Sequence, residues 1–202
     1  MRKYILSPFI ILTSLLFVSG SSIALLNPVP KDNPIVAIET EKGLIVVELY
    51  MDKAPITVAN FLRYVEENRL EDATFYRSVR IDNQPDNDIK IEVIQGGLFE
   101  DNHPMMLPSI VHENTRQTGV KHMDGVISMA RYTPGTATSE FFICIGDQPS
   151  LDFGGERNKD GAGFAAFGKV IEGMEIVRLI QHLPAEGQYL SPKIKILSVY
   201  KK

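Results

Sequence analysis

The sequence predicts a mostly β protein whose strands close, or nearly close, into a barrel with helices at its ends. After residue 35, short runs of β-branched and aromatic residues recur between turns and loops rich in Gly, Pro and Asn. Only two segments have the periodicity of an amphipathic helix. No repeat and no change in composition divides this part of the chain, so residues 35–202 are expected to form one domain.

The first 24 residues have the pattern of a secretory signal peptide. Arg2 and Lys3 precede an apolar stretch from Tyr4 to Val18, and the small residues SGSSIA follow at 19–24. This stretch is shorter than the roughly 20 residues of a membrane-spanning helix, which favours cleavage over a retained anchor. We therefore expect an exported protein, in a periplasm, with no stable membrane insertion after cleavage.

A linker and a hairpin follow. Residues 25–34 are rich in Pro and Asn and have no periodicity, so they are expected to be a linker. The stretch IVAIETEKGLIVVELY at 35–50 holds two strand-like runs, separated by Thr40 to Gly43. Gly43 can adopt the positive φ that such a turn requires.

Two helices are predicted. The first lies within 54–70, with Pro55 near its first turn. Its core-facing residues recur at the spacing i, i+3, i+4, i+7 and are Val58, Phe61, Leu62 and Val65. The second covers 174–181, and its core-facing residues are Ile176, Val177 and Ile180.

The remaining strand-like runs are 74–79, 91–95, 126–130, 140–145, 163–173 and 193–200. The single cysteine, Cys144, lies in one of them and is expected to be a small buried hydrophobic residue. In TFYRSVR, at 74–80, strand alternation places Arg77 on the same face as Phe75 and Val79. Either Arg77 reaches out to solvent, or this apolar surface requires a fixed cation.

Several function classes lack support. The net charge of −4 and the absence of a basic run argue against nucleic acid or an anionic membrane as a partner. The four histidines are dispersed, without the spacing of metal ligands, so no metal site is expected. Ser128 and Ser139 have no associated base in the sequence, which argues against a serine hydrolase.

Six motifs in order carry a family resemblance: FYR, VIQGG, ISMAR, GTATSEFFI, SLD and FGKVIEGMEIV. Through them, the chain resembles the cyclophilin-type peptidyl-prolyl isomerases, and most closely their exported bacterial members, from about Ile35 to Tyr200. The resemblance implies a closed eight-stranded antiparallel barrel with a helix over each end. It also implies an outer groove that holds proline-containing polypeptides across an X-Pro bond, and no cofactor.

The chemistry of that reaction explains the arginine. An X-Pro bond rotates over a barrier near 18–20 kcal/mol, because the amide nitrogen is conjugated with the carbonyl. Twisting turns the prolyl nitrogen into a hydrogen-bond acceptor only at the transition state. A fixed guanidinium aimed at this nitrogen therefore stabilises the transition state more than the ground state.

The resemblance assigns roles to individual residues. It makes Arg77 the catalytic cation and Gln95 the residue that steadies it, with Tyr76, where many relatives have His, lining the groove. Phe142 and Leu151 form the floor of the proline pocket. The wall residue is Phe164, and Ala130 lies along the peptide path and contributes mainly backbone groups.

Some positions depart from the family pattern. Residues 81–90 are a polar, acidic insertion, expected to be a solvated loop that can also reach over the groove. Glu92 replaces an apolar wall residue, so that wall is either missing or supplied from the insertion. The resemblance also places Glu140 among the substrate-binding residues, where relatives have a glutamine, and its carboxylate can either clamp Arg77 or neutralise it. Ser150 replaces a tryptophan, so cyclosporin binding is expected to be weak.

The sequence is also compatible with two other functions. The scaffold can serve as a non-catalytic module or chaperone that binds proline peptides. It can also recognise a single partner protein through the acidic insertion. The retained Arg77, Gln95 and Phe142 favour the isomerase.

Overall fold

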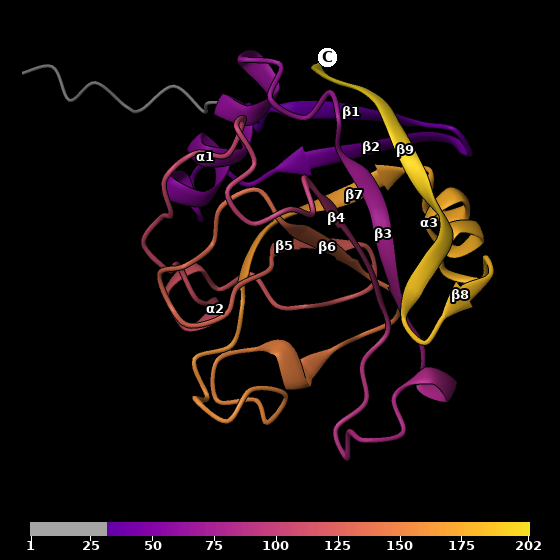
Figure 1. Ribbon diagram of the computed structural model, residues 1–202. Coiled ribbons are helices and arrows are strands. Elements are labelled where there is room, and N and C mark those ends of the chain that lie inside the picture. Colours follow the sequence, from indigo (N-terminus) through magenta and orange to yellow (C-terminus); the bar gives the residue numbers. More distant parts are fainter. Residues whose placement is uncertain (1–31) are drawn as a thin grey trace, which may run out of the picture. The chain divides into compact units, whose positions relative to one another are not determined.

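The computed structural model describes residues 32–202, whose strands form one antiparallel sheet (Figure 1). The strands pair in the order β1-β2-β7-β5-β6-β4-β3-β9, and β9 also pairs with β1. That last pairing closes the ring, so the expected eight-stranded barrel is confirmed. A short ninth strand, β8, pairs only with β9. The strands are β1 (Ile35–Thr40), β2 (Gly43–Leu49), β3 (Thr74–Val79), β4 (Val93–Gly97), β5 (Val126–Met129), β6 (Phe141–Cys144), β7 (Ala165–Glu172), β8 (Ala185–Glu186) and β9 (Tyr189–Lys201).

The two predicted helices are α1 (Pro55–Glu66) and α3 (Met174–Gln181), on opposite sides of the strands in Figure 1. All four core-facing positions predicted for α1 are buried. In α3, Val177 and Ile180 are buried, whereas Ile176 is half-buried over the β1–β2 turn. Gly43 in that turn has φ +138°, and a Cβ there would lie 2.7 Å from Ile176 Cδ1.

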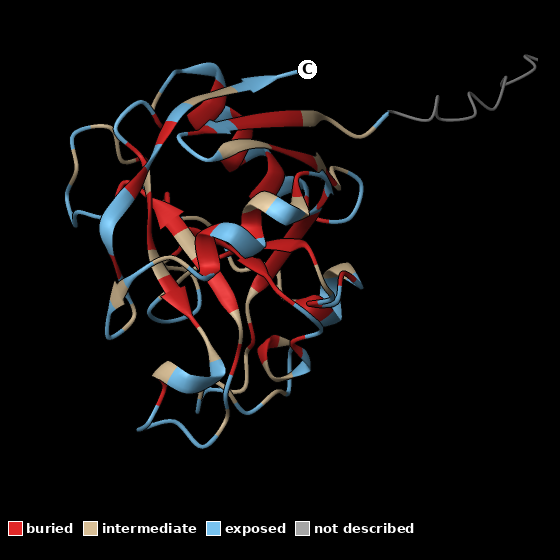
Figure 2. Cartoon of the chain, turned by 90° about the vertical axis from the view of Figure 1, so that its right-hand side faces the viewer, coloured by how far each residue is buried: buried red, intermediate tan, exposed pale blue. Residues whose placement is uncertain are grey.

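Aromatic rings fill the interior of the barrel. Phe61 from α1 packs edge-on against Phe141 of β6, with ring centroids 5.6 Å apart, and Phe75 of β3 contacts Phe141 from 5.7 Å. Buried residues follow the strands, and exposed residues gather on the connecting loops (Figure 2). Because the interior is filled, a substrate site has to lie on the outside of the barrel.

Strand β6 is buried on both faces. Phe141 and Ile143 belong to the barrel core, whereas Phe142 and Cys144 belong to a second apolar cluster on the outer face. This explains the unbroken apolar run FFIC. Cys144 is fully buried, as predicted, and burial raises the pKa of its thiol.

Several elements were not predicted from the sequence. They are the short helix α2 (Thr115–Thr118), the 3-10 helices η1 (Ile81–Asn83) and η2 (Pro149–Leu151), the strand β8 and the first residues of β9. Strand β9 runs through Pro192, a residue that favours a strand end, so the sequence pattern indicated a later start. Gly187, with φ +61°, turns the chain between β8 and β9.

The proposed signal peptide, 1–24, and most of the proposed linker, 25–34, lie outside the described residues. At the start of the described part, Asn33 donates to Glu48 Oε1 over 3.0 Å, and the Pro34 carbonyl accepts from Leu49 N. The packed structure therefore includes these last two linker residues. Within residues 32–202, no helix has both the length and the hydropathy to cross a membrane.

Candidate active site

A β-bulge at Tyr76 sets the direction of the arginine. Against β4, Phe75 pairs with Gly96 and Arg77 with the adjacent Gln95, so Tyr76 is the extra residue. The pairing of β3 with β9 shifts at the same place, from Ile194 to Tyr189. Phe75 points into the barrel core, whereas Arg77 faces a pocket on the outside and Val79 belongs to the outer apolar cluster. The prediction that Arg77 shares a face with Phe75 is therefore wrong, because simple alternation does not continue through a bulge.

Two neutral side-chain amides hold the Arg77 guanidinium. Nη1 donates to Gln95 Oε1 over 2.9 Å. Nε and Nη2 both donate to Gln188 Oε1, over 2.9 Å and 2.5 Å. These contacts use three of the five guanidinium N–H groups, so within residues 32–202 two remain for a ligand.

The charge of Arg77 is not neutralised by a bonded carboxylate. Among the described residues, none of the ion pairs includes Arg77. Partial burial lowers the pKa of Arg77 from its ordinary value, since desolvation disfavours the cation. A guanidinium remains protonated in proteins, so the pocket contains a desolvated cation.

Glu140 is linked to Arg77 only through the side chains of Tyr76 and Gln95. Gln95 Nε2 donates to Tyr76 Oη, and Tyr76 Oη donates to Glu140 Oε2, each over 2.5 Å. The chain Arg77–Gln95–Tyr76–Glu140 therefore runs donor to acceptor at every step. Neither alternative for Glu140 holds, since it neither clamps nor directly pairs with Arg77. Burial and the nearby Glu140 charge raise the pKa of Tyr76 well above its ordinary value, so its phenol stays protonated.

The Glu140 carboxylate lies where only glycine fits. Its Oε1 accepts from Phe99 N at 3.1 Å and from Ser139 Oγ at 3.0 Å. A Cβ on Gly97, which has φ +144°, would collide with this carboxylate. The glycine after Gln95 and Gly96 thus makes room for the group that fixes Tyr76.

The pocket beside Arg77 has a volume of about 330 Å³. All eight residues that the resemblance assigned to the site line it: Tyr76, Arg77, Gln95, Ala130, Glu140, Phe142, Leu151 and Phe164. Phe142 and Phe164 meet edge to face, with centroids 5.4 Å apart. The placement agrees with the assigned site, while the role of each residue stays a prediction.

The pocket has an apolar wall on the side where Glu92 replaces an apolar residue of the family pattern. Ile91 and Val93, which alternate with Gln95 along the chain, line the pocket and are buried. Glu92 points elsewhere and accepts from Gln181 Nε2 at 3.3 Å. Ile91 directly follows the insertion, so the wall comes from the strand entry rather than from residues 81–90.

The insertion borders the pocket without lining it. Its acidic residues Asp82, Asp86 and Asp88 are exposed, as expected for a solvated loop. Its last part is tied across the pocket end, because Arg157 Nη1 donates to the Ile89 carbonyl over 2.5 Å. Arg157 is itself a pocket residue.

Arg131 supports the pocket wall. Its guanidinium lies over the Phe164 ring, 5.1 Å from the centroid, and donates twice to Asp160. These bonds lower the pKa of Asp160 to about 2. The side chain of Arg131 is almost fully buried, so it fixes Phe164 and is not an exposed cation.

One expectation about Ser128 is wrong. Its hydroxyl lies 2.9 Å from His122 Nε2, and His122 Nδ1 lies 2.9 Å from Asp152 Oδ1. This is the residue set of a hydrolase triad, assembled by the fold rather than by sequence spacing. Ser128 and His122 are buried, and the His122 ring stacks on Phe142 behind the pocket. The set therefore supports the pocket floor and offers no accessible nucleophile.

Within residues 32–202, no three His, Cys, Asp or Glu side chains gather as a metal site would require. The sequence reasoning missed Gln188, which bonds Arg77 but is not among the residues that line the pocket. Gln188 has no local signal, because it follows a two-residue strand and reaches Arg77 across 111 positions. The sequence reasoning also missed further residues that line the pocket, which are Phe99, Glu100, Asp101, Met106, Tyr132, Thr136, Thr138, Arg157 and Asn158.

Comparisons with known proteins agree with this architecture. The family model described as cyclophilin type peptidyl-prolyl cis-trans isomerase/CLD matches residues 35–201. A peptidyl-prolyl cis-trans isomerase of Acinetobacter baylyi is 36% identical over 83% of this chain and 85% of its own length. Peptidyl-prolyl cis-trans isomerase B of Escherichia coli is 34% identical over 73% of this chain and 84% of its own.

A solved structure shares the fold. A cyclophilin type isomerase of Cryptosporidium parvum, crystallised in the presence of the dipeptide Ala-Pro, superposes with a TM-score of 0.66 at 21% identity. The match covers 83% of this chain and 98% of that one. The shared fold agrees with the sequence matches, which extend over most of both chains. The chain therefore belongs to the family of cyclophilin-type peptidyl-prolyl cis-trans isomerases.

Proposed function

We propose that this protein accelerates rotation about X-Pro bonds in unfolded or partly folded exported proteins, through guanidinium stabilisation of the twisted amide by Arg77. The observation that carries the proposal is the state of Arg77. It is a partly buried cation, held by two neutral amides and bonded to no carboxylate in the described residues, beside the apolar part of the pocket.

The mechanism follows from differential binding. In the planar ground state, the prolyl nitrogen has no available lone pair, because the pair is conjugated with the carbonyl. As the bond twists, the nitrogen becomes pyramidal and accepts a hydrogen bond from one of the two remaining N–H groups of Arg77. The direction of the guanidinium is set beforehand by Gln95 and Gln188, so no reorganisation is required at the transition state.

The apolar part of the pocket holds the proline ring. Phe142, Leu151, Phe164 and Val93 offer a concave, buried surface next to Arg77. A ring seated there is fixed, while the residue before the proline is free to rotate. The presence of Ala-Pro in crystals of the Cryptosporidium parvum relative supports a proline-containing ligand.

The test is two-dimensional NMR exchange on an Ala-Pro peptide with substoichiometric protein. The proposal predicts cis–trans exchange much faster than the uncatalysed process, which takes tens to hundreds of seconds. Uncatalysed rates, together with peptide shifts that move on titration, would replace the isomerase with the binding module. If the protein neither accelerates exchange nor moves the peptide shifts, both the isomerase and the binding module are excluded.

Export belongs to the same proposal. The signal-like residues 1–24 motivate it, and mass spectrometry of the protein secreted by a bacterial host should find a chain that starts near residue 25. Retention of an intact N-terminus in the membrane fraction would overturn it.

With Ser150 where relatives carry tryptophan, cyclosporin should inhibit only weakly.

A further inference from the structure

We propose that Gln188 is a positioning residue that holds the Nε edge of Arg77, and that the 81–90 insertion holds Gln188 in turn. This inference rests on the proposed function of Arg77. Gln95 bonds only Nη1, and a guanidinium held at one corner can still pivot about that bond. The single oxygen of Gln188 accepts from both Nε and Nη2, which removes this freedom.

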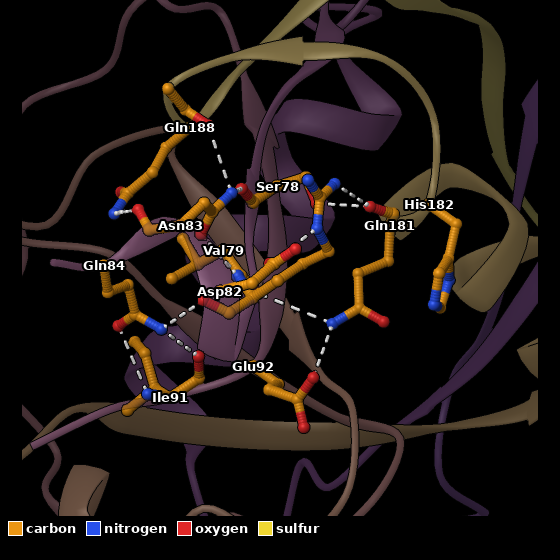
Figure 3. A network of polar contacts seen from close by, with 12 residues as sticks. Ser78, Val79, Asp82, Asn83, Gln84, Ile91, Glu92, Gln181, His182 and Gln188 are labelled. Carbon is orange, nitrogen blue, oxygen red and sulfur yellow. Dashed lines mark hydrogen bonds and ion pairs between the residues drawn. The ribbon is translucent and has the colours of Figure 1, made fainter.

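The amide of Gln188 can face Arg77 in only one orientation. Its Nε2 donates to the Asn83 carbonyl over 3.1 Å, and this bond directs Oε1 toward the guanidinium. Its backbone carbonyl accepts from Ser78 N at 2.9 Å, next to Arg77 in β3. Figure 3 shows the bonds of Gln188 to Ser78 and to Asn83.

Asn83 belongs to the insertion and is itself anchored. Its Nδ2 donates to the Ser78 carbonyl at 2.9 Å and to the Gly187 carbonyl at 3.2 Å, so it bridges β3 and the turn before Gln188. Its Oδ1 accepts from Arg80 N at 2.8 Å. The insertion is thus bonded to β3, which carries Arg77, and to the β8–β9 turn, which carries Gln188.

Gln84 stabilises the base of the insertion. It is 1% exposed, and its Nε2 donates to the carbonyls of Arg80 and Ile91 at 2.7 Å and 2.8 Å. Its Oε1 accepts from Ile91 N at 3.3 Å. One buried amide therefore joins the two ends of the loop (Figure 3), which fixes the loop base while its acidic tip stays in solvent.

The experiment compares Gln188→Met with the native protein. Methionine keeps the length of the side chain and removes the acceptor. We expect kcat to fall roughly tenfold with little change in KM, because a misdirected guanidinium weakens only the transition state. In the same variant, solvent exchange of the Arg77 Nε–H proton, assigned by its loss in Arg77→Ala, should accelerate by about tenfold or more.

Two further variants complete the design. Gln117→Met makes the same change at an exposed residue of α2 outside the pocket and should leave kcat at the native value. Asn83→Ala should lower kcat in the same direction as Gln188→Met but by less. Added to Gln188→Met, it should cause no further loss, because both act on one contact chain.

The outcomes separate the two proposals. A native kcat in Gln188→Met, while Arg77→Ala is inactive, overturns the role of Gln188 and leaves the isomerase intact. A loss of kcat in Gln117→Met equal to that in Gln188→Met also overturns the role of Gln188. Independent, multiplying losses for Asn83→Ala and Gln188→Met overturn the link to the insertion. If the native protein accelerates no exchange, the proposed function fails, whereas the Nε–H measurement still reports whether Gln188 holds Arg77.

Discussion

At the scale of single residues, the site keeps a cation charged by surrounding it with neutral acceptors. Gln95 and Gln188 bind Arg77, and the nearest carboxylate in the bonded chain, Glu140, is separated from it by Gln95 and Tyr76. A carboxylate bonded directly to Arg77 would hold it equally well but would weaken its attraction for the prolyl nitrogen. The relay through Tyr76 fixes Gln95 without this cost.

Tyr76→Phe tests the relay. The change keeps the ring and removes the hydroxyl that joins Gln95 to Glu140, so Gln95 loses one partner. Loss of one hydrogen bond is worth about 1 kcal/mol, so kcat/KM should fall roughly fivefold. Peptide exchange kinetics measure this. An unchanged rate in a folded Tyr76→Phe variant would show that Gln95 needs no support from Glu140.

Neither Tyr76 nor Arg77 changes its charge near neutral pH. The raised pKa of Tyr76 keeps the phenol neutral, and Arg77 stays cationic despite its lowered pKa. The kcat measured between about pH 6 and 9 should therefore be flat, since no proton is transferred in the mechanism. A bell-shaped profile over this range would contradict it.

At the scale of elements, the bulge in β3 brings Tyr76 and Arg77 to the outer surface together. Neighbouring residues of a regular strand point to opposite faces, so without the bulge one of them would enter the barrel. A bulge depends on pairing with β4 and β9, and such pairing is not visible in a single sequence.

The helices illustrate both what the sequence could predict and what it could not. The apolar spacing of Val58, Phe61 and Val65 correctly predicted α1, because periodicity depends on local sequence alone. Its N-terminal cap could not be found in this way. Ala54 offers no side-chain cap, and the role falls to Glu113, whose carboxylate accepts from Ile56 N, Thr57 N and Thr57 Oγ1.

Glu113→Ala should destabilise the barrel without changing its chemistry. The helix α1 then loses its anionic cap, which costs about 1–2 kcal/mol of the free energy of unfolding. Urea titration measures the loss, and kcat should stay native because Glu113 does not line the pocket. Glu71→Ala, at an exposed glutamate after α1, is the matched control. Equal stability of the two variants would show that Glu113 does not cap the helix.

The candidate site likewise has one part that the sequence predicted and another that it did not. Family motifs placed eight residues on one pocket, because each motif is local, but Gln188 was missed since it meets Arg77 only in the folded barrel. Ser128 likewise gained its histidine through folding. Contacts between distant segments are the part that composition and spacing do not reveal.

At the scale of the whole molecule, two carboxylates join loops to one another, Asp152 to His122 and Asp160 to Arg131, and give the fold an acid limit. Burial alone would raise the pKa of Asp152, but hydrogen bonds from His122 outweigh it and lower the pKa below 3.8. Arg131 lowers the pKa of Asp160 to about 2. Both groups favour the folded state when ionised, so their contribution is complete above pH 3.8 and is lost as the pH falls toward 2.

The unfolding midpoint in urea should therefore stay level from neutral pH to about 4.5 and then fall as these carboxylates are protonated. In Asp152→Asn, the stability at neutral pH should be lower and the fall on acidification smaller. A native midpoint that rises below pH 3.8 would contradict the assigned roles of these two groups.

The most direct test of the account compares the native protein with Arg77→Ala in one NMR series that yields both the exchange rate and the dissociation constant of an X-Pro peptide. If Arg77 stabilises only the twisted amide, kcat should fall by roughly a hundredfold or more while the dissociation constant changes by less than about threefold. Native exchange rates in a folded Arg77→Ala variant would contradict the account, because the barrel would then accelerate rotation without its cation.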